Sequence, residues 1–304
     1  SGAELSDLLR AAVRRQARIG FRDGVSITRL LDDGAEVSDG TRQRVRAATV
    51  VLATGGFGAD AELVARFCPT ASRAIHAGSA LSDGAALRLT EPLDAALACM
   101  DSYQGQPHVS PHLVNGVRPR FGAALPALGA ILVNRRGERF VDETMGPSEL
   151  TAHILAQPEG RAVEIWDTEA HQSALAGGPF RRAVELGAVV TFAEVKTLAE
   201  HFGLPCRTLA HALSEPATRC LSKPYFAAEV TGALAHTQGG LAVNGRAQVL
   251  RHDGSPIRNL LAAGGAACGM SGHGAAGYVP GNGLAQSFGL GFLAGKAAAD
   301  LTRR

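Results

Sequence analysis

The sequence predicts an α/β fold into which a second, capping α+β domain is inserted, and three observations lead to this prediction. Two short runs of small and β-branched residues, 47–53 and 259–263, have the unbroken apolar pattern of strands buried on both faces of a covered sheet. Both runs end in Gly-Gly. The stretch between about 106 and 231 differs in composition and pattern, because it is rich in prolines, histidines and charged residues and has no regular periodicity. We therefore expect an outer α/β domain that is split by an insertion.

The elements of the first third follow from periodicity and turn signals. Leu5, Leu8 and Leu9 recur at helical spacing and predict a helix over 5–17. Strands are predicted over 24–31 and 35–45, on either side of an Asp-Asp-Gly turn, and the first buried strand follows at 47–53. Asp60 is in position to cap a helix that runs to 67. A turn over 81–84 then leads into a helix that ends near 92.

The remaining predicted elements belong either to the insertion or to the second part of the outer domain. Inside the insertion, the pattern predicts a strand over 130–133, a turn over 134–138, and helices over 150–156 and 192–202. The outer domain resumes with strands at 240–243, 248–250 and 259–263, and a last helix starts at Asn282 or Gly283. The predicted domains are 1–105 and 232–304 for the outer domain, with 106–231 between them.

The composition excludes several classes of protein. The 304 residues are 46% hydrophobic and 19% charged, which gives a sizeable core. The net charge of +2 and an aromatic content of 5% argue against a nucleic-acid partner. No apolar run is long enough for a membrane span, and five scattered cysteines are typical of reduced thiols. We therefore expect a cytoplasmic protein.

Glycine gives the first functional signal. The chain has 37 glycines in 304 residues, whereas glycine usually makes up ~7% of a protein. They cluster at 54–58, 239–245 and 264–295. In open α/β sheets, ligands lie beyond the carboxyl ends of the strands, and a helix beginning near Asn282 would add unpaired N–H groups there. Such a site suits a phosphate or the anionic edge of a reduced flavin, although glycines can also simply form tight turns in a packed core.

Other motifs are less informative. The segment 272–277 matches GxGxxG, but no strand immediately precedes it, so a Rossmann fingerprint is not indicated. His108 and His112 have the spacing of a helical zinc pair, but a proline between them disfavours the helix. Asp142 and Glu143 are candidate acid–base groups, although adjacent acidic residues in a loop are usually solvated.

The motifs together resemble those of the FAD-dependent oxidoreductases related to fumarate reductase and succinate dehydrogenase flavoproteins, most of all the branch with tricarballylate dehydrogenase and 3-ketosteroid dehydrogenases. The resemblance rests on segments that occur in the family's order, namely VVLATGGF (50–57), SDG (82–84), ILVNRRGERFVDE (131–143), HTQGGL (236–241), NLLAAGG (259–265), YVPGNGL (278–284) and FGLGFLAG (288–295). It implies a partial FAD-binding Rossmann-like domain with an inserted capping domain. It also implies FAD as cofactor, a small-molecule substrate, and an electron donor or acceptor that the sequence does not identify.

The resemblance carries roles to individual residues. It implies that the adenosine half of FAD lies along Thr54, Gly55 and Gly56. The pyrophosphate, ribityl and ring portions would meet Gly264, Gly265, Gly281, Asn282, Gly283 and Leu284. His236 matches a histidine that binds a substrate carboxylate in the reductases, and Tyr278 is similar to the tyrosine that polarises a carbonyl in the steroid dehydrogenases. These two are the predicted catalytic residues, and no metal is expected.

Departures from the family pattern limit the prediction. Where fumarate reductases have two arginines, this chain has Pro147 and the segment 277–279, which argues against fumarate or succinate as substrate. The N-terminal βαβ unit of the family is not recognised, so we expect a truncated chain. The leading hypothesis is hydride transfer between flavin N5 and a carbon next to a carbonyl or carboxylate. The alternatives are a non-catalytic or truncated flavoprotein-fold fragment without bound cofactor and, less well supported for lack of a fingerprint, an NAD-only dehydrogenase.

Overall fold

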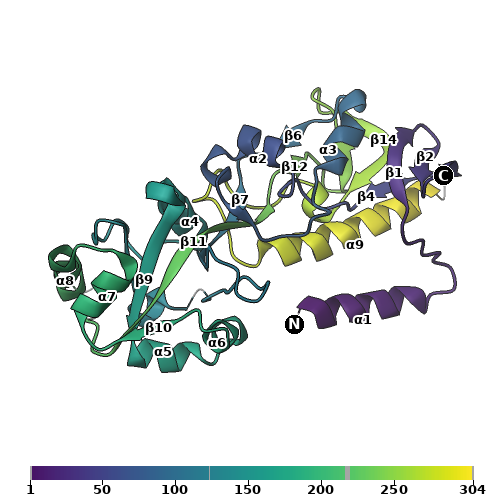
Figure 1. Cartoon of the computed structure of the whole chain (residues 1–304). Helices are drawn as coiled ribbons and strands as arrows, with labels where there is room; N and C mark the ends of the chain where they lie inside the picture. Colours follow the sequence, from purple (N-terminus) through teal and green to yellow (C-terminus); the bar gives the residue numbers. More distant parts are fainter. Residues whose placement is uncertain (1, 123, 216–219, 303–304) are drawn as a thin grey trace.

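The computed structural model describes residues 2–122, 124–215 and 220–302, and Figure 1 shows them as two lobes connected by one long strand. The helices are α1 (Gly2–Arg14), α2 (Ala61–Phe67), α3 (Ala85–Thr90), α4 (Pro147–Ala156), α5 (Thr168–Ala174), α6 (Gly178–Glu185), α7 (Val195–Phe202), α8 (Cys206–Ser214) and α9 (Asn282–Thr302). The strands are β1 (Ser26–Leu31), β2 (Gly34–Ser38), β3 (Arg42–Arg46), β4 (Val50–Leu52), β5 (Ile75–His76), β6 (Leu97–Ala98), β7 (Tyr103–Val109), β8 (Ile131–Val133), β9 (Arg161–Asp167), β10 (Val190–Phe192), β11 (Tyr225–Thr237), β12 (Gly240–Leu241), β13 (Gln248–Leu250) and β14 (Pro256–Ala262). The connecting strand is β11.

The first lobe holds the two glycine-ended strands side by side. Its sheet has the order β13-β14-β4, and β14 runs parallel to β4 with Leu261 opposite Val51. The first lobe also contains a separate three-stranded meander, β1-β2-β3, and a two-stranded pair, β6–β12. The long helix α9 runs beneath this lobe in Figure 1 and packs against β14 and the short 3₁₀ helix Gly264–Ala266. This packing brings the start of α9 to the end of β14.

The second lobe is a sheet between two apolar layers. Its strands have the order β10-β11-β9-β8, and the far half of β11 pairs with β7 and β5 on the way to the first lobe. Side chains alternate along the strands, so Trp166 packs with α5 and α6 on one face while Ile165 packs with α7 and α8 on the other. Because each face is buried by its own helices, this lobe has its own core.

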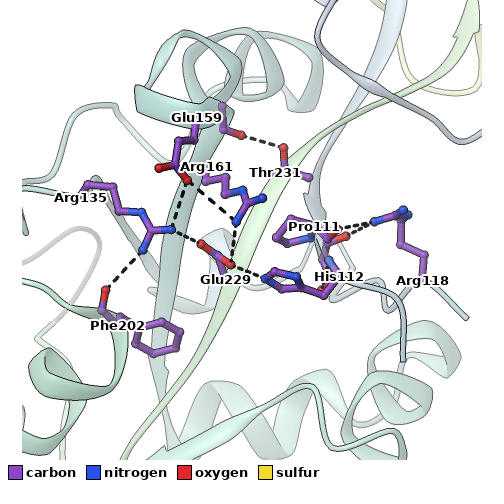
Figure 2. A network of polar contacts seen from close by, with 11 residues as sticks. Pro111, His112, Arg118, Arg135, Glu159, Arg161, Phe202, Glu229 and Thr231 are labelled. Atoms are coloured by element: carbon purple, nitrogen blue, oxygen red, sulfur yellow. Dashed lines mark hydrogen bonds and ion pairs between the residues drawn. The ribbon is translucent and has the colours of Figure 1, made fainter. Parts of the chain in front are cut away.

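A network of charged side chains in the second lobe connects the sheet to its loops (Figure 2). Glu229 on β11 contacts Arg135 Nη2 at 2.7 Å, His112 Nε2 at 2.7 Å and Arg161 Nη1 at 3.6 Å. Glu159 adds a looser contact with Arg135 at 3.6 Å. The Glu229 carboxylate thereby joins β9 and β11 to the loops that follow β7 and β8.

The structure corrects two sequence predictions. The single strand expected over 35–45 is a hairpin of β2 and β3, because Ser38 and Asp39 accept hydrogen bonds from Gly40 N and Thr41 N in a tight turn. The strand expected to be buried on both faces is shorter, β4, and is an edge strand among the described residues. Leu52 is fully buried, whereas Val51 is 40% exposed.

Other predictions are confirmed or stay open. Asp60 caps α2 by accepting hydrogen bonds from Glu62 N and Leu63 N, both at 3.0 Å. The predicted domain boundaries at 105/106 and 231/232 lie inside β7 and β11, and the division into domains stays a prediction. Among residues 2–122, 124–215 and 220–302, every helix is too short or too polar to cross a membrane.

Candidate cofactor site

The carboxyl ends of β4 and β14 meet, and the two chains that leave them touch backbone to backbone. Ala263 N donates to Leu52 O at 2.9 Å, just beyond the paired residues. A Cβ added to Gly265 would lie 2.9 Å from Gly56 N and 3.2 Å from Gly55 C, which is closer than ordinary packing. Glycine is therefore required at 265 by the approach of a second backbone. The prediction that the two glycine-ended strands lie together is confirmed.

Thr237 fixes this junction from a third segment, the end of β11. Its Oγ1 accepts a hydrogen bond from Phe57 N at 3.1 Å, and Phe57 and Thr237 are both almost fully buried. A Cβ on Gly56 would overlap the same Oγ1, so glycine at 56 leaves room for this bond. The chain that leaves β4 is thereby bonded to the end of β11.

Thr54 and Gly55 lie at the edge of a cavity of about 940 Å³ between the first lobe's meander and α3. Gly55 has a φ of +79°, and a Cβ there would lie 2.8 Å from Ser82 Oγ, which lines the same cavity. The hydroxyl oxygen of Thr54 is buried and has no hydrogen-bond partner in the protein. A buried polar atom without a partner is costly, so its presence at a cavity indicates a position where a ligand could supply one.

The other glycine-ended strand is connected directly to α9. Gln286 Nε2 donates to Gly264 O at 2.9 Å and to Ala267 O at 2.7 Å. Gly264 has a φ of +59°, so the chain turns sharply as it leaves β14. These two bonds set the distance between the end of β14 and the first turns of α9.

Asn282 is the first residue of α9 and is 3% exposed. Its Nδ2 donates to Gln238 Oε1 at 3.1 Å and to Ser271 Oγ at 2.7 Å, while its Oδ1 has no partner. The first N–H groups of a helix also lack intrahelical acceptors and carry the positive end of the dipole. Gly281 before it has a φ of +83°, and Leu284 in the first turn is 61% exposed.

His236 lies against this helix start. Its Nε2 accepts a hydrogen bond from Gln238 Nε2 at 2.6 Å, which leaves Nδ1 as the protonated nitrogen of a neutral ring. Burial lowers the pKa of His236 below its ordinary value of 6.5, so the ring is uncharged at neutral pH. A Cβ on Gly283 would lie 3.0 Å from His236 Nε2, so glycine at 283 lets the helix approach the ring.

Tyr278 is the second predicted catalytic residue, and the structure places it beside the first. The rings of His236 and Tyr278 are 6.4 Å apart at an interplanar angle of 77°. Burial raises the pKa of the Tyr278 phenol, so the hydroxyl keeps its proton at neutral pH. The pair therefore presents two neutral groups, an imidazole and a phenol, at the start of α9.

The structure thus links most of the predicted site residues, with Gly281 and Leu284 joined to them only through their positions at the start of α9. Sequence reasoning missed the residues that make the links, among them Gln238, Gln286 and Thr237. One signal was available for Gln238, since residues two apart in an extended segment point to the same side, and Gln238 follows His236 by two. No signal predicted that it would bond to Asn282, which comes from a distant segment.

Two other candidate groups have structural partners elsewhere. Glu143 is 2% exposed and accepts hydrogen bonds from Leu132 N at 3.0 Å and Arg139 Nη2 at 2.6 Å, so the expectation of a solvated residue was wrong. His108 contacts Glu164 inside the second lobe, whereas His112 contacts Glu229. Within the described ranges, no cluster of three His, Cys, Asp or Glu side chains is arranged to hold a metal ion.

Comparisons with known proteins match the chain to a family model and to relatives of known name. A family model described as an FAD binding domain matches residues 2–284. A probable fumarate reductase of Shewanella frigidimarina is 28% identical, and the alignment covers 98% of this chain and 53% of that protein. A 4-oxocyclohexanecarboxylate 2-dehydrogenase of Sinomonas cyclohexanicum is 30% identical, with 96% of this chain and 59% of that protein covered. The chain therefore spans little more than half the length of these relatives.

Solved structures show the same similarity. The open conformation of a flavocytochrome c3 fumarate reductase is 26% identical with a TM-score of 0.78, covering 99% of this chain and 56% of that one. A 3-ketosteroid-Δ4-(5α)-dehydrogenase from Rhodococcus jostii, in complex with 4-androstene-3,17-dione, is 25% identical with a TM-score of 0.68, covering 90% and 59%. Both resemble this chain over nearly all of its length.

Proposed function

This chain belongs to the FAD binding domain family, and from that premise we propose that it serves an oxidoreductase that transfers hydride between flavin N5 and a substrate carbon next to a carbonyl or carboxylate. One observation carries the proposal. The bare ends of β4 and β14 and the start of α9 converge, and buried polar atoms without partners, Thr54 Oγ1 and Asn282 Oδ1, lie at this convergence.

The residues present fit an extended, anionic cofactor. Backbone without side chains at 55–56 and 264–265 allows close approach, and the start of α9 favours negative charge. Thr54 Oγ1 and Asn282 Oδ1 offer hydrogen-bonding groups that the protein itself does not use. We assign the adenosine half to Thr54, Gly55 and Gly56. The rest of the cofactor is assigned to Gly264, Gly265, Gly281, Asn282, Gly283 and Leu284.

When bound, FAD supplies two-electron chemistry at N5, and the protein's own side chains orient the substrate. With Nε2 occupied by Gln238, the neutral ring of His236 donates through Nδ1–H. The protonated phenol of Tyr278 is a second donor beside it. Two neutral donors polarise a carbonyl or carboxylate oxygen and can deliver a proton at the adjacent carbon.

The substrate class is inferred from the charge of the two donors, set against the substrates in the names of the relatives. Their names include fumarate, acrylate and urocanate, in which an alkene is conjugated to a carboxylate, and a 4-oxocyclohexanecarboxylate, which carries a ketone as well. His236 and Tyr278 provide no fixed positive charge for a carboxylate clamp. We therefore favour a substrate activated by a carbonyl, an enone or its saturated ketone, over a dicarboxylate.

The segment 106–231 is proposed as a capping domain. Its sheet and helices form a separate core, and β11 leads from it straight to His236. A lobe attached in this way can cover the site, exclude water and hold the substrate against the two donors. The electron donor or acceptor remains unassigned.

The test uses the full-length natural protein. FAD is titrated in, and binding is followed by quenching of flavin fluorescence. The bound flavin is then reduced anaerobically with dithionite and challenged with a cyclic enone, fumarate or acrylate. We expect tight binding and reoxidation by the enone. His236→Asn and Tyr278→Phe should each slow reoxidation by about 10²–10⁴-fold, the range of a lost acid–base or electrophilic group.

His252→Asn is the matched control, because His252 is an exposed histidine paired with Asp94 away from the site. It should bind FAD and react as the unmodified protein does. Failure to bind FAD would reject the proposal, whereas binding without reoxidation by any of the three acceptors would favour the alternative of a non-catalytic flavoprotein fold.

A further inference from the structure

A cavity of about 220 Å³ lies over β7, in continuation of His236, and Gln104, Gln106 and His108 of this strand line it. Gln104 is the residue of β7 that pairs with His236 on β11. Directly paired residues of neighbouring strands point to the same face of a sheet, and so do residues two apart in one strand. The cavity therefore lies on the face that carries His236, and it leads from there towards the second lobe.

Arg120 brings a positive charge to this cavity. Its backbone forms an isolated bridge with Val109 at the end of β7, and its side chain is part of the cavity lining. Arg120 Nη2 donates to Ala77 O at 3.4 Å, and Ala77 N donates to Leu234 O at 2.8 Å. Because Leu234 precedes His236 by two residues, the guanidinium is held close to the end of β11 that carries His236.

The protein itself makes little use of the polar groups in this lining. Within the described ranges, Arg120 makes that one long hydrogen bond and no ion pair, and the half-buried amides of Gln104 and Gln106 have no partner. The lining contains no aspartate or glutamate. Glu164 lies behind His108, fully buried, with one carboxylate oxygen 3.0 Å from His108 Nδ1. Arg120 is therefore a positive charge without a counter-charge, beside two free amides.

These groups suit a carboxylate, since the planar fork of a guanidinium matches the two oxygens of a carboxylate and an amide adds an N–H donor. We propose that the cavity binds a carboxylate of the substrate, held by Arg120, Gln104 and Gln106, while His236 and Tyr278 act on a carbonyl at the other end. This inference rests on the proposed function and narrows its substrate class to a ketone or enone that also carries a carboxylate.

The strand sets the spacing between the two groups of this substrate. Gln104 lies opposite His236, and Gln106 lies two residues further along β7, which is roughly 7 Å at the rise of a strand. A carbonyl and a carboxylate on opposite carbons of a six-membered ring fit this spacing, whereas groups on neighbouring carbons do not. The carboxylate is then remote from the reacting carbon, so its binding should affect KM rather than kcat.

The test uses the full-length natural protein with FAD and two pairs of probes. 4-Oxocyclohexanecarboxylate and its neutral methyl ester are titrated in a calorimeter, which measures binding without turnover. 4-Oxocyclohex-2-enecarboxylate and its methyl ester are then used to reoxidise the dithionite-reduced protein. In that reaction the alkene takes up one hydride and one proton and becomes the saturated ketone. We expect the acid of each pair to bind more tightly than its ester.

Variants of Arg120 test whether this residue is responsible. Arg120→Gln should raise the Kd and KM of the two acids by about 10- to 100-fold, the range of a lost hydrogen bond to a charged group, and the loss should appear in KM rather than in kcat. Arg120→Lys should keep part of the preference for the acids, because it retains the charge and loses the fork. Arg182→Gln is the matched control, since it removes an exposed arginine of α6 that is paired with Glu185, and it should keep the full preference.

Equal binding of acid and ester, or a preference for the acids that survives in Arg120→Gln, would overturn the inference. Reoxidation by the ester enone in that case would leave the proposed function standing. Failure of both enones to reoxidise the protein would count against the proposed function, while the calorimetric comparison of acid and ester would still decide whether the cavity binds a carboxylate.

Discussion

Replacing Gly56 with alanine tests whether the bare backbone at the end of β4 is a structural requirement. The new Cβ would overlap Thr237 Oγ1, while its next neighbours, Gly265 O at 3.5 Å and Thr237 O at 3.6 Å, lie at ordinary contact distances. The Thr237 hydroxyl is therefore the single obstacle. To make room, it must rotate away from Phe57 N, to which it is bonded at 3.1 Å.

The cost can be worked out from that displacement. Phe57 is 1% exposed and Thr237 2%, so the freed N–H gains no water. A buried donor without a partner costs about 1–3 kcal/mol, and overpacking by one methyl group adds about 1–3 kcal/mol, for a total of about 2–6 kcal/mol. Since whole domains are stable by only about 5–15 kcal/mol, the loss should be large enough to measure directly.

Urea unfolding of the variants gives the assay, and a double-mutant cycle isolates the mechanism. Thr237→Ala alone should cost about 1–3 kcal/mol through the lost acceptor. Adding Gly56→Ala to that variant should then change the unfolding free energy by less than about 0.5 kcal/mol, because the obstacle is gone. An additive cycle, with the same loss for Gly56→Ala in both backgrounds, would refute the reasoning.

A glycine inside a helix provides the control for this experiment. Gly289 lies within α9 and has nothing within 4 Å of an added Cβ. Gly289→Ala should therefore stabilise the chain by roughly 0.5–1 kcal/mol, because alanine favours helix more than glycine does. A loss at Gly289 comparable to that at Gly56 would show that the effect is not specific to the junction.

Three further outcomes follow from contacts described above. Glu143→Ala should lower the unfolding free energy by about 3–5 kcal/mol in urea titrations, because it leaves the buried end of Arg139 without its carboxylate. His236→Asn should weaken the dependence of stability on pH, because burial lowers the folded pKa of His236 below 6.5 and the unfolded chain therefore binds more protons in that range. The fall in stability below pH 6.5 should become smaller in the variant, with the contribution of His171, whose pKa burial also lowers, left in place. Glu229→Ala should cost less, about 1–3 kcal/mol, and the loss should shrink in high salt, since the arginines around it are about one third exposed.

The meeting of the two glycine-ended strands could be predicted from the sequence, because the signal for it, a pair of glycines after a strand, lies within a few residues of each strand. Each strand ends in Gly-Gly, and the sheet rule that places ligands at carboxyl ends needs no knowledge of the intervening chain. The parallel pairing of β4 with β14 confirms that the two strand ends lie together, and α9 starts at Asn282 as predicted. That a cofactor lies at these ends stays a prediction. The roles of His236 and Tyr278 in catalysis stay predictions.

The second lobe was not predictable in the same way. Strand β11 is thirteen residues long, but it pairs with β9, β10, β7 and β5, which come from four separate segments. Such pairing leaves no local signal, and the alternation of its side chains was obscured because both faces are buried. The burial of Glu143 depends on Arg139 and Leu132 meeting it in space, which periodicity alone does not show.

Three of the buried polar atoms that the protein leaves unpaired support the proposed position of the binding site on energetic grounds. Thr54 Oγ1, Asn282 Oδ1 and Ser102 Oγ are buried without partners, and Ser102 O accepts a hydrogen bond from Gln238 N. Each such atom costs about 1–3 kcal/mol, and packing alone does not justify three of them around one junction. A ligand that hydrogen-bonds to them would remove the cost only in the folded state, so cofactor bound at the proposed site should stabilise the folded chain.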